Sequence, residues 1–391
     1  MTPRFLTSFS GAAFCLSVAA VITLSLSRPA TSQQGAPGAA VADIQQARAT
    51  EALAAAAAAA QAAGIALRDV EWVDTTRQRT LPVRLYLPKA VQLATQSASQ
   101  SASHPAAQPA ALNAPAASTK LPLVVFSHGL GGSRLGYAHF GRHFAQNGFI
   151  ALHLQHPGSD RAVWSGGPFA ILGNVQAAAS EANVLGRAQD VSFALDMLLA
   201  DQELGPLIDR EAIAVAGHSY GANTAMLLAG AAVERNGKRV SFADARIRAA
   251  ILLSAPPFHG EGDQAAALRD VRVPTLHITG TDDVIRVPGY RSDAADRIGV
   301  FRDMPATPAA AKHLAIFEGG EHSVFTDRTR SDRALAIKAA ARDLSLAFLL
   351  SAFRGQPDTL GNALAAARPM LVTPEQVMAR RFENEIRSTA N

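Results

Sequence analysis

Cysteine is almost absent from this chain of 391 residues, because Cys15 is the only one. No disulfide can form within the chain, so its fold must be stable without one. Cys15 lies in the middle of an apolar run and follows Phe14 rather than Gly or Ala, which excludes a lipidation site.

A large excess of either charge is also missing. The chain has 36 Lys and Arg against 32 Asp and Glu, and no dense basic cluster with interleaved aromatic residues occurs. Nucleic acid is therefore not expected as a partner, and nothing indicates an obligate protein partner. Hydrophobic residues make up 48% of the chain, which is ample for a sizeable core although many of them are alanine.

The N-terminal residues have the pattern of an export signal. Arg4 precedes an apolar run that extends to Leu26, and Ser, Pro, Gln and Gly follow. This predicts a signal peptide over residues 1–27, cleaved within residues 27–32, and hence a periplasmic or secreted protein. The run is long enough for an uncleaved membrane anchor, which is the alternative.

Composition divides the remaining chain into four parts. Residues 28–64 are rich in Ala and predict a solvated spacer helix. Residues 89–120 are low-complexity Ala, Ser, Gln and Pro, which predicts a disordered surface insertion. The insertion falls inside one α/β domain over residues 65–353, and residues 354–391 form a C-terminal extension.

The domain begins with two β-rich runs, 70–73 and 83–87, around a polar turn, which predict an antiparallel hairpin. Near-continuous apolar strands then alternate with helical stretches, a pattern typical of a mostly parallel sheet covered by helices on both faces. The expected strands are 123–127, 149–155, 213–216, 249–253, 275–279 and 314–317, and the expected helices are 137–147, 181–200, 220–233, 331–353 and 374–387.

Polar motifs follow four of these strands. They are "SHGLGG" from Ser127, "GHSYG" around Ser219, "TGTDD" ending in Asp282 and Asp283, and "GGEHS" with His322. The carboxyl ends of parallel strands meet at one edge of a sheet, so these motifs are expected to converge. The order Ser, Asp, His along the chain is the order of an α/β-hydrolase triad.

Each residue type has a chemical reason to be there. Ser219 is the predicted nucleophile, and His322 the base that takes its proton. A carboxylate on the far side of the imidazole fixes its tautomer and stabilises the imidazolium. Asp283 is preferred for that role because its spacing from Gly280 is the one expected after this strand, and Asp282 is the alternative.

The oxyanion of a tetrahedral intermediate needs preorganised donors. The backbone N–H groups of Leu130 and Tyr220 are the candidates, one in the Gly-rich loop and one at the start of a helix. Gly217 and Gly221 flank the nucleophile because side chains there would collide with the neighbouring strand and helix.

Four further residues are candidates for the substrate pocket: His156, Trp164, Phe169 and Phe258. Each also has a structural interpretation. His156 could stabilise a turn, and the aromatic residues could pack within their own loops. His218 is next to the nucleophile, but we expect the strand-to-helix turn to point it away, in a structural role.

No metal or organic cofactor is expected. His139 and His143 are four residues apart on a helix, but no third ligand or Glu base accompanies them. Gly131 and Gly132 lack the Lys-Ser/Thr that a phosphate-binding P-loop requires.

Together with "VEWVDTTRQRTLPVRLYLP" and "PLVVFSHGLGGS", the motifs "GHSYG", "HITGTDD" and "GGEHSVF" resemble a bacterial α/β-hydrolase family described as predicted dienelactone hydrolases. That family is related to platelet-activating-factor acetylhydrolases. The resemblance covers residues 68–353. It implies a serine carboxylic-ester hydrolase with nucleophile Ser219, acid Asp283, base His322 and an oxyanion hole at Leu130 and Tyr220.

Two features depart from related enzymes. Dienelactone hydrolases proper use a cysteine nucleophile, which is missing here. Secreted polyester hydrolases usually carry Met after the nucleophile and a disulfide, whereas this chain has Tyr220 and no possible disulfide.

The sequence therefore predicts an exported serine esterase acting on a small-molecule or lipid-like ester. A polyester hydrolase or an acyltransferase on the same triad is one alternative, distinguished by degradation of insoluble polyester or by an added alcohol that competes with water. A non-catalytic envelope binding protein with the same fold is the alternative from another class.

Overall fold

The structure, a computed structural model, describes residues 58, 60, 62, 64–89, 91, 120–235, 237–258, 263–287 and 290–389. The predicted export signal, most of the Ala-rich spacer and most of the insertion lie outside these residues. Ala60 of the spacer and Val91 of the insertion are described, and both side chains are buried in the core.

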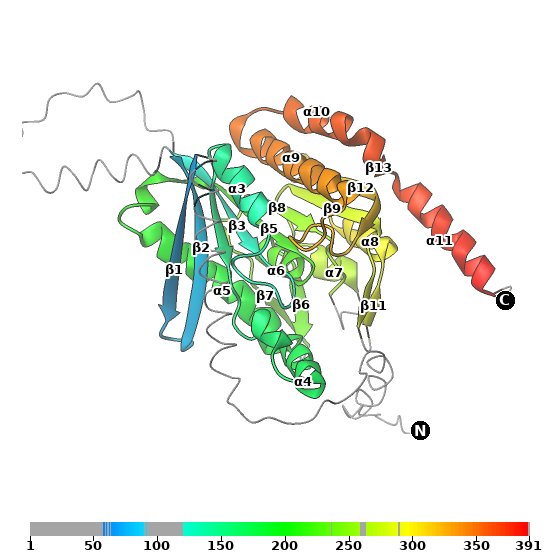
Figure 1. Ribbon diagram of the computed structural model, residues 1–391, viewed down its shortest axis with the longest axis horizontal. Coiled ribbons are helices and arrows are strands. Elements are labelled where there is room, and N and C mark those ends of the chain that lie inside the picture. The colour runs from blue at the N-terminus through cyan, green and yellow to red at the C-terminus, as the bar shows by residue number, and fades with distance from the viewer. Residues whose placement is uncertain are drawn as a thin grey trace, which may run out of the picture.

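A nine-stranded sheet forms the centre of the fold, in the order β1-β2-β4-β3-β5-β8-β9-β12-β13 (Figure 1). Its strands are β1 (Ile65–Asp74), β2 (Arg79–Pro88), β3 (Leu121–Ser127), β4 (Ile150–Leu154), β5 (Ile208–His218), β8 (Ala249–Leu253), β9 (Thr275–Asp282), β12 (Lys312–Glu321) and β13 (Leu371–Val372). The strands from β4 to β12 run parallel, which confirms the predicted sheet. Two small hairpins lie outside it, β6 (Ala232–Arg235) with β7 (Lys238–Ser241) and β10 (Ile285–Val287) with β11 (Tyr290–Ser292).

The predicted N-terminal hairpin is confirmed. β1 and β2 pair antiparallel from Ile65–Pro88 to Asp74–Arg79, and the turn between them contains Gln78 with a positive φ of 49°. β2 then pairs antiparallel with β4, so the hairpin extends the parallel part of the sheet rather than standing alone.

Helices cover both faces of the sheet. The α-helices are α3 (Ala138–Gln146), α4 (Pro168–Ala178), α5 (Glu181–Ala200), α6 (Tyr220–Leu228), α7 (Gln264–Leu268), α8 (Ala294–Asp303), α9 (Asp332–Arg354), α10 (Asp358–Ala367) and α11 (Pro374–Thr389). Short 3-10 turns are η1 (Arg161–Trp164), η2 (Gly205–Leu207) and η3 (Arg368–Met370). α5 and α6 contribute to the core on one face, and α3 and α9 to the core on the other.

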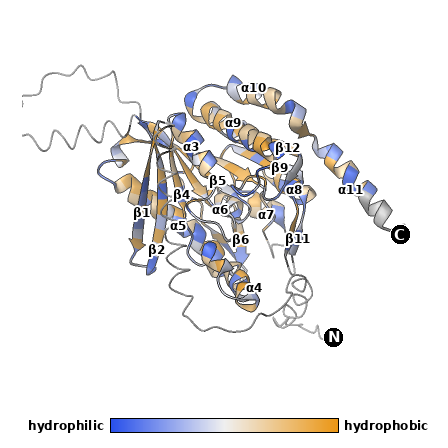
Figure 2. Ribbon diagram, viewed as in Figure 1, coloured by the Kyte–Doolittle hydropathy of each residue, from blue (hydrophilic) through white to orange (hydrophobic). Residues whose placement is uncertain are grey.

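The two cores arise because successive side chains along each strand point to opposite faces of the sheet. In β3, Leu123 and Val125 belong to the core beneath α5 and α6, whereas Val124 and Phe126 belong to the core beneath α3 and α9. Successive strand side chains point to opposite faces, so a strand buried on both faces is apolar throughout. Figure 2 shows this as apolar colouring along the central strands.

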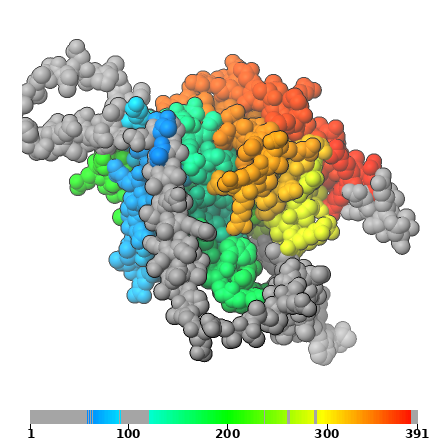
Figure 3. Space-filling view, viewed as in Figure 1, coloured from blue at the N-terminus to red at the C-terminus, as the bar shows by residue number. Residues whose placement is uncertain are grey.

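Most elements match their predicted ranges, and the differences have local causes. The helix predicted over 220–233 ends at Leu228 because Gly230, with φ of 122°, turns the chain into β6. A side chain at Gly230 would collide with the backbone of Asp270. The extension beyond residue 353 continues the fold, since α10 packs on α9 and β13 pairs with β12. In Figure 3 these orange and red segments form one continuous surface.

Candidate active site

The chain makes a sharp turn at Ser219, between β5 and α6. Ser219 has φ of 54° and ψ of −120°, a conformation that residues with a Cβ rarely adopt. The turn is close-packed on both sides, because a Cβ at Gly217 would meet the backbone of Gly221, and one at Gly221 would meet the carbonyl of Ser127. The N–H of Ser219 donates to the carbonyl of Leu253, 2.9 Å away. The turn is therefore held firmly and presents the serine hydroxyl at the sheet edge.

The structure brings Ser219, His322 and Asp283 together in one chain of hydrogen bonds. The Oγ of Ser219 lies 2.9 Å from Nε2 of His322, and Nδ1 of His322 lies 2.7 Å from Oδ1 of Asp283. Asp283 follows β9 and His322 follows β12, whose carboxyl ends share this edge of the sheet. This is the geometry that a histidine needs to take a proton from a serine hydroxyl.

Asp283, rather than Asp282, contacts the histidine. Asp283 is fully buried, and its second oxygen accepts a hydrogen bond from Oγ1 of Thr279 at 2.7 Å. Asp282 is exposed, and its carboxylate accepts from the hydroxyl of the preceding Thr281. Of the two carboxylates left open by the sequence, Asp283 alone is placed against His322.

The environment keeps Asp283 ionised. Burial opposes its charge, but the hydrogen bond with His322 and the nearby guanidinium of Arg297 outweigh burial and hold the pKa of Asp283 well below its usual range. Nη2 of Arg297 lies 3.4 Å from Oδ1 of Asp283, and this arginine is itself buried. A buried carboxylate of this kind can stabilise an imidazolium on His322.

We expect Asp283→Asn to lower kcat by about 10³- to 10⁴-fold at neutral pH, because the amide cannot hold the Nδ1–H tautomer of His322. The matched substitution Asp282→Asn changes an exposed neighbour, and we expect it to keep kcat within about twofold. Steady-state hydrolysis of p-nitrophenyl acetate by both variants measures this. Equal losses in the two variants would contradict the assignment of Asp283.

The two predicted oxyanion donors have free N–H groups. Among the described residues, the backbone N–H of neither Leu130 nor Tyr220 donates a hydrogen bond. Tyr220 is the first residue of α6, where the helix dipole favours negative charge. The Leu130 loop is fixed on its other side, since the N–H of Gly131 donates to the carbonyl of Ser159 at 2.9 Å. These donors are suited to an anion that forms beside Ser219.

A cavity of about 540 Å³ lies over Ser219 and His322. Its lining includes the apolar side chains of Leu130, Leu135, Trp164 and Ile285, and the polar side chains of Arg161, Asp327 and Arg328. Nε1 of Trp164 donates to the carbonyl of Gly131 at 3.0 Å, which holds the indole against the Gly-rich loop. A larger cavity of about 730 Å³ lies between α8 and α11, and it contains none of the predicted site residues.

Of the four candidate pocket residues, only Trp164 lines the cavity over Ser219. The side chain of Phe169 in α4 is 89% exposed and is not part of the lining. Phe258 packs into the core beneath α5 and α6. His156 is fully buried behind the Leu130 loop. The aromatic content of a loop does not determine which ring turns toward the site, so the sequence could not separate these residues.

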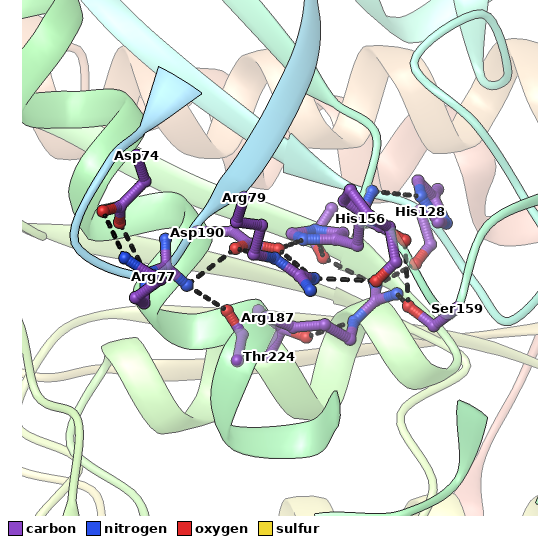
Figure 4. Close-up of polar contacts among 12 residues, drawn as sticks. Asp74, Arg77, Arg79, His128, His156, Ser159, Arg187, Asp190 and Thr224 are labelled. Carbon is purple, nitrogen blue, oxygen red and sulfur yellow. Dashed lines mark hydrogen bonds and ion pairs between the residues drawn. The ribbon is translucent and has the colours of Figure 1, made fainter. Parts of the chain in front are cut away.

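A buried polar cluster lies behind the Leu130 loop (Figure 4), and we call it the Arg187 network. It consists of Ser127, His128, His156, Ser159, Arg187, Asp190 and Thr224. Arg187 donates to the carbonyl of His128, to Oγ of Ser127 at 2.9 Å, to Oγ of Ser159 at 2.8 Å and to Oγ1 of Thr224 at 3.0 Å. One side chain thus connects the end of β3, the Ser159 turn that holds Gly131, and α6.

Asp190 supplies the negative charge of the network. Its carboxylate accepts hydrogen bonds from Nδ1 of His156 at 2.9 Å, from Arg79 at 2.7 Å and from Arg77 at 2.9 Å. Burial opposes ionisation, but the contacts with His156 and Arg79 outweigh it and lower the pKa of Asp190 to about 2. Sequence reasoning missed this network, because its contacts join α5 to residues far away in the chain.

The network contains a second Ser-His-Asp sequence of contacts, from Ser127 through His156 to Asp190. Oγ of Ser127 lies 3.0 Å from Nε2 of His156. All three residues are completely buried, and the guanidinium of Arg187 occupies the other side of the Ser127 hydroxyl. A substrate carbonyl has no access to this serine, so these residues hold the Leu130 loop rather than form a second active centre.

His218 does not point away from the site, which corrects the expectation from the sequence. Its ring packs against the ring of His322 with a centroid distance of 4.8 Å. The β-strand alternation places the residue before the nucleophile on the face of the sheet that α3 covers, and the His322 loop lies over that face.

The described residues contain no group of three or more His, Cys, Asp or Glu side chains that could hold a metal ion. His139 and His143 do not form a pair, because Nε2 of His139 contacts the carbonyl of Phe325 and Nε2 of His143 lies 3.3 Å from Asp343.

The mostly parallel sheet, the turn at Ser219 and the Ser-His-Asp contacts define an α/β hydrolase. The sequence model of the alpha/beta hydrolase family matches residues 124–386, and the chain belongs to that family. The model of platelet-activating factor acetylhydrolase, isoform II, matches residues 69–165, a segment that contains the Leu130 loop and ends before Ser219.

Individual relatives are distant. Platelet-activating factor acetylhydrolase of Cavia porcellus is 28% identical over 134 residues, which covers 27% of this chain and 31% of the relative. The match thus spans less than a third of that relative's length. A solved ferulic acid esterase from Streptomyces cinnamoneus is 21% identical with a TM-score of 0.51, and the comparison covers 74% of this chain and 90% of that one. At this identity the likeness shows the fold alone.

Proposed function

We propose that the protein is an exported serine esterase that hydrolyses carboxylic esters through an acyl-enzyme. The observation that carries this proposal is the continuous chain from Ser219 Oγ through His322 to the buried Asp283, at the floor of a cavity. The family supports it, and the named relatives are an acetylhydrolase and an esterase.

The reaction has two halves. Ser219 Oγ attacks the ester carbonyl while Nε2 of His322 takes its proton, and the oxyanion lies between the N–H groups of Leu130 and Tyr220. The intermediate collapses when His322 returns the proton to the departing alcohol. Water, deprotonated by His322, then attacks the acyl group and releases the carboxylic acid and Ser219. Asp283 stays ionised throughout and stabilises the imidazolium.

We infer that the acyl part of the substrate is small. The cavity of about 540 Å³ holds both the acyl and the alcohol parts of an ester, and the indole of Trp164 bounds it beside the loop that carries Leu130. The acetylhydrolase relative is named for removal of a two-carbon acyl group, in line with a short acyl site. We therefore propose short-chain esters, of small molecules or of lipid-like alcohols, as the substrate class.

We expect p-nitrophenyl acetate and butyrate to be hydrolysed with at least a tenfold higher kcat/KM than the octanoate, about 1.4 kcal/mol in transition-state binding. Trp164→Ala removes one wall, and we expect it to shift the preference toward octanoate. Phe169→Ala is the matched control, since this exposed ring does not line the cavity, and its profile should equal that of the wild type. An unchanged profile in Trp164→Ala would contradict the assigned wall.

Export is proposed from the pattern of residues 1–27 alone. Within the described part of the chain, no helix combines the length and the apolar character needed to cross a bilayer. Determining the N-terminal residue of protein recovered from the periplasm or the medium tests the proposal, because a start within residues 28–33 is expected after cleavage.

A further inference from the structure

We propose that Tyr137 and His218 are positioning residues that couple the Leu130 loop to the backbone of His322. The inference rests on the proposed function, because it assigns these residues a part in the same reaction. Tyr137 precedes α3, and His218 is the last residue of β5, directly before Ser219. Both side chains are at least 95% buried.

Three hydrogen bonds form a continuous path between the two halves of the site. The N–H of Gly129 donates to the hydroxyl of Tyr137 at 3.3 Å, and this hydroxyl lies 2.8 Å from Nδ1 of His218. Nε2 of His218 lies 2.8 Å from the carbonyl oxygen of His322. Gly129 precedes Leu130, so the path begins at the loop that carries one oxyanion donor and ends at the proposed base.

The groups at the two ends of the path, the N–H of Gly129 and the carbonyl oxygen of His322, determine which atom is the donor in each hydrogen bond. A carbonyl oxygen can only accept, so Nε2 of His218 must carry a proton and donate it to His322. In a neutral imidazole Nδ1 is then the acceptor, and the Tyr137 hydroxyl must donate to it. The tyrosine oxygen is left to accept from the N–H of Gly129. The hydroxyl of Tyr137 thus selects the tautomer of His218, much as Asp283 selects that of His322.

His218 must stay neutral for this arrangement to assist catalysis. Its ring packs against that of His322, which becomes positively charged when Ser219 is deprotonated, and a second cation there would oppose that charge. Burial and the neighbouring His322 lower the pKa of His218 to about 3, against the opposing influence of the His322 carbonyl and Asp283, and Arg297 lowers it further. His218 is therefore a neutral hydrogen-bond donor throughout the range in which esterases work.

Close packing at Gly129 is an independent observation. A Cβ there would lie 3.1 Å from both Nδ1 of His218 and the hydroxyl of Tyr137, tighter than ordinary contact. The loop backbone thus rests directly on the pair of side chains. A shift of either ring displaces the loop and the His322 backbone together, and misplacement by about 1 Å can lower a rate by about 100-fold.

Activity measurements on three variants and one control distinguish a positioning role from a role in folding. Tyr137→Phe removes the donor that selects the tautomer, and we expect kcat to fall by about tenfold with KM nearly unchanged. His218→Asn retains an acceptor for Tyr137 but is too short to reach the His322 carbonyl, and we expect a loss in kcat of about 100-fold. His218→Gln reaches that carbonyl with its amide N–H, so it should recover most of the activity. Tyr86→Phe removes a buried hydroxyl outside the path and should leave kcat unchanged.

Histidine-selective ¹⁵N NMR tests the path even if the protein proves not to be an esterase. The chain has 11 histidines, and His218→Gln identifies the resonances of His218. We expect a neutral Nε2–H tautomer between about pH 5 and pH 9, and a mixture of tautomers in Tyr137→Phe. An Nδ1–H tautomer, a titration in this range, or His218→Asn as active as the wild type would overturn the proposal. An inert wild type that shows the expected tautomer would refute the esterase function alone.

Discussion

Replacing Ser219 with alanine is expected to lower kcat for p-nitrophenyl butyrate by about 10⁴- to 10⁶-fold. The loss is this large because no acyl-enzyme can form without the hydroxyl, and the remaining groups act only through binding and the oxyanion donors. The alanine side chain also fits the turn, so the variant should fold normally, which circular dichroism and a thermal melt check.

Ser127→Ala is the informative control for Ser219→Ala, because Ser127 also belongs to a Ser-His-Asp sequence of contacts. It removes one of several hydrogen bonds in the Arg187 network, and the carbonyl of His128 remains bonded to Arg187. We expect a fall in kcat of about tenfold at most. If Ser127→Ala instead abolished activity in a folded protein and Ser219→Ala did not, the assignment of the two sites would have to be exchanged.

Acid is expected to destabilise the protein well above the pH at which its carboxylates are protonated. Among the described residues, five buried histidines are neutral in the fold: His128, His153, His156, His218 and His277. Burial is the main cause in each, and it lowers the pKa to about 3 for His153, His218 and His277, to about 4 for His156, and well below its usual value for His128.

The direction of this change in stability with pH follows from the number of protons that the folded and unfolded states bind. These pKa values lie below the value of about 6.5 in an unfolded chain, so the unfolded state binds more protons as the pH falls below that value. At pH 5 each of the four histidines with a pKa of about 3 or 4 then lowers the free energy of unfolding by about 2 kcal/mol relative to pH 8, and the four together by about 8 kcal/mol, comparable with the whole stability of a domain. His128 acts in the same direction. We expect the protein to unfold between about pH 4 and pH 5.

Urea unfolding at a series of pH values measures this effect. His277 is buried away from the site, its Nε2 has no partner among the described groups, and it contacts the ring of Phe301. His277→Met should reduce the fall between pH 8 and pH 5 by about 2 kcal/mol, whereas His313→Met, at a half-buried histidine, should reduce it by less. A wild-type stability that is constant from pH 8 to pH 5 would contradict the buried neutral histidines.

Periodicity and turn chemistry were sufficient to predict the sheet from the sequence. β8 and α5 occupy the predicted residues, because an apolar strand and a long helix each carry their own signal. α4, α7, α8 and α10 were not predicted, and α4 shows why: its residues are mostly apolar but form no stripe, and most of them are exposed in the fold. β13 has two residues and exists only because β12 offers an edge.

The site divides in the same way. The loops that carry Ser219, His322 and the N–H group of Leu130 each follow a strand. The order of strands and motifs along the chain is therefore enough to place these groups at the correct edge of the sheet. The spacing from Gly280 favoured Asp283 over Asp282, and the structure places Asp283 against His322, but the sequence left Asp282 open because the choice depends on one residue of register after β9. Arg187, Asp190 and the contact between Tyr137 and His218 join residues far apart in the chain, and no local pattern encodes such long-range pairs.

The most direct test of the central claim is to locate the reactive serine. The purified wild-type protein is treated with a fluorophosphonate, which phosphonylates an activated serine, and the modified peptide is identified by mass spectrometry. We predict one phosphonyl group per chain, on Ser219, and none in Ser219→Ala or on the buried Ser127. A folded wild-type protein that stays unmodified, or that carries the label on another serine, would contradict the proposed nucleophile.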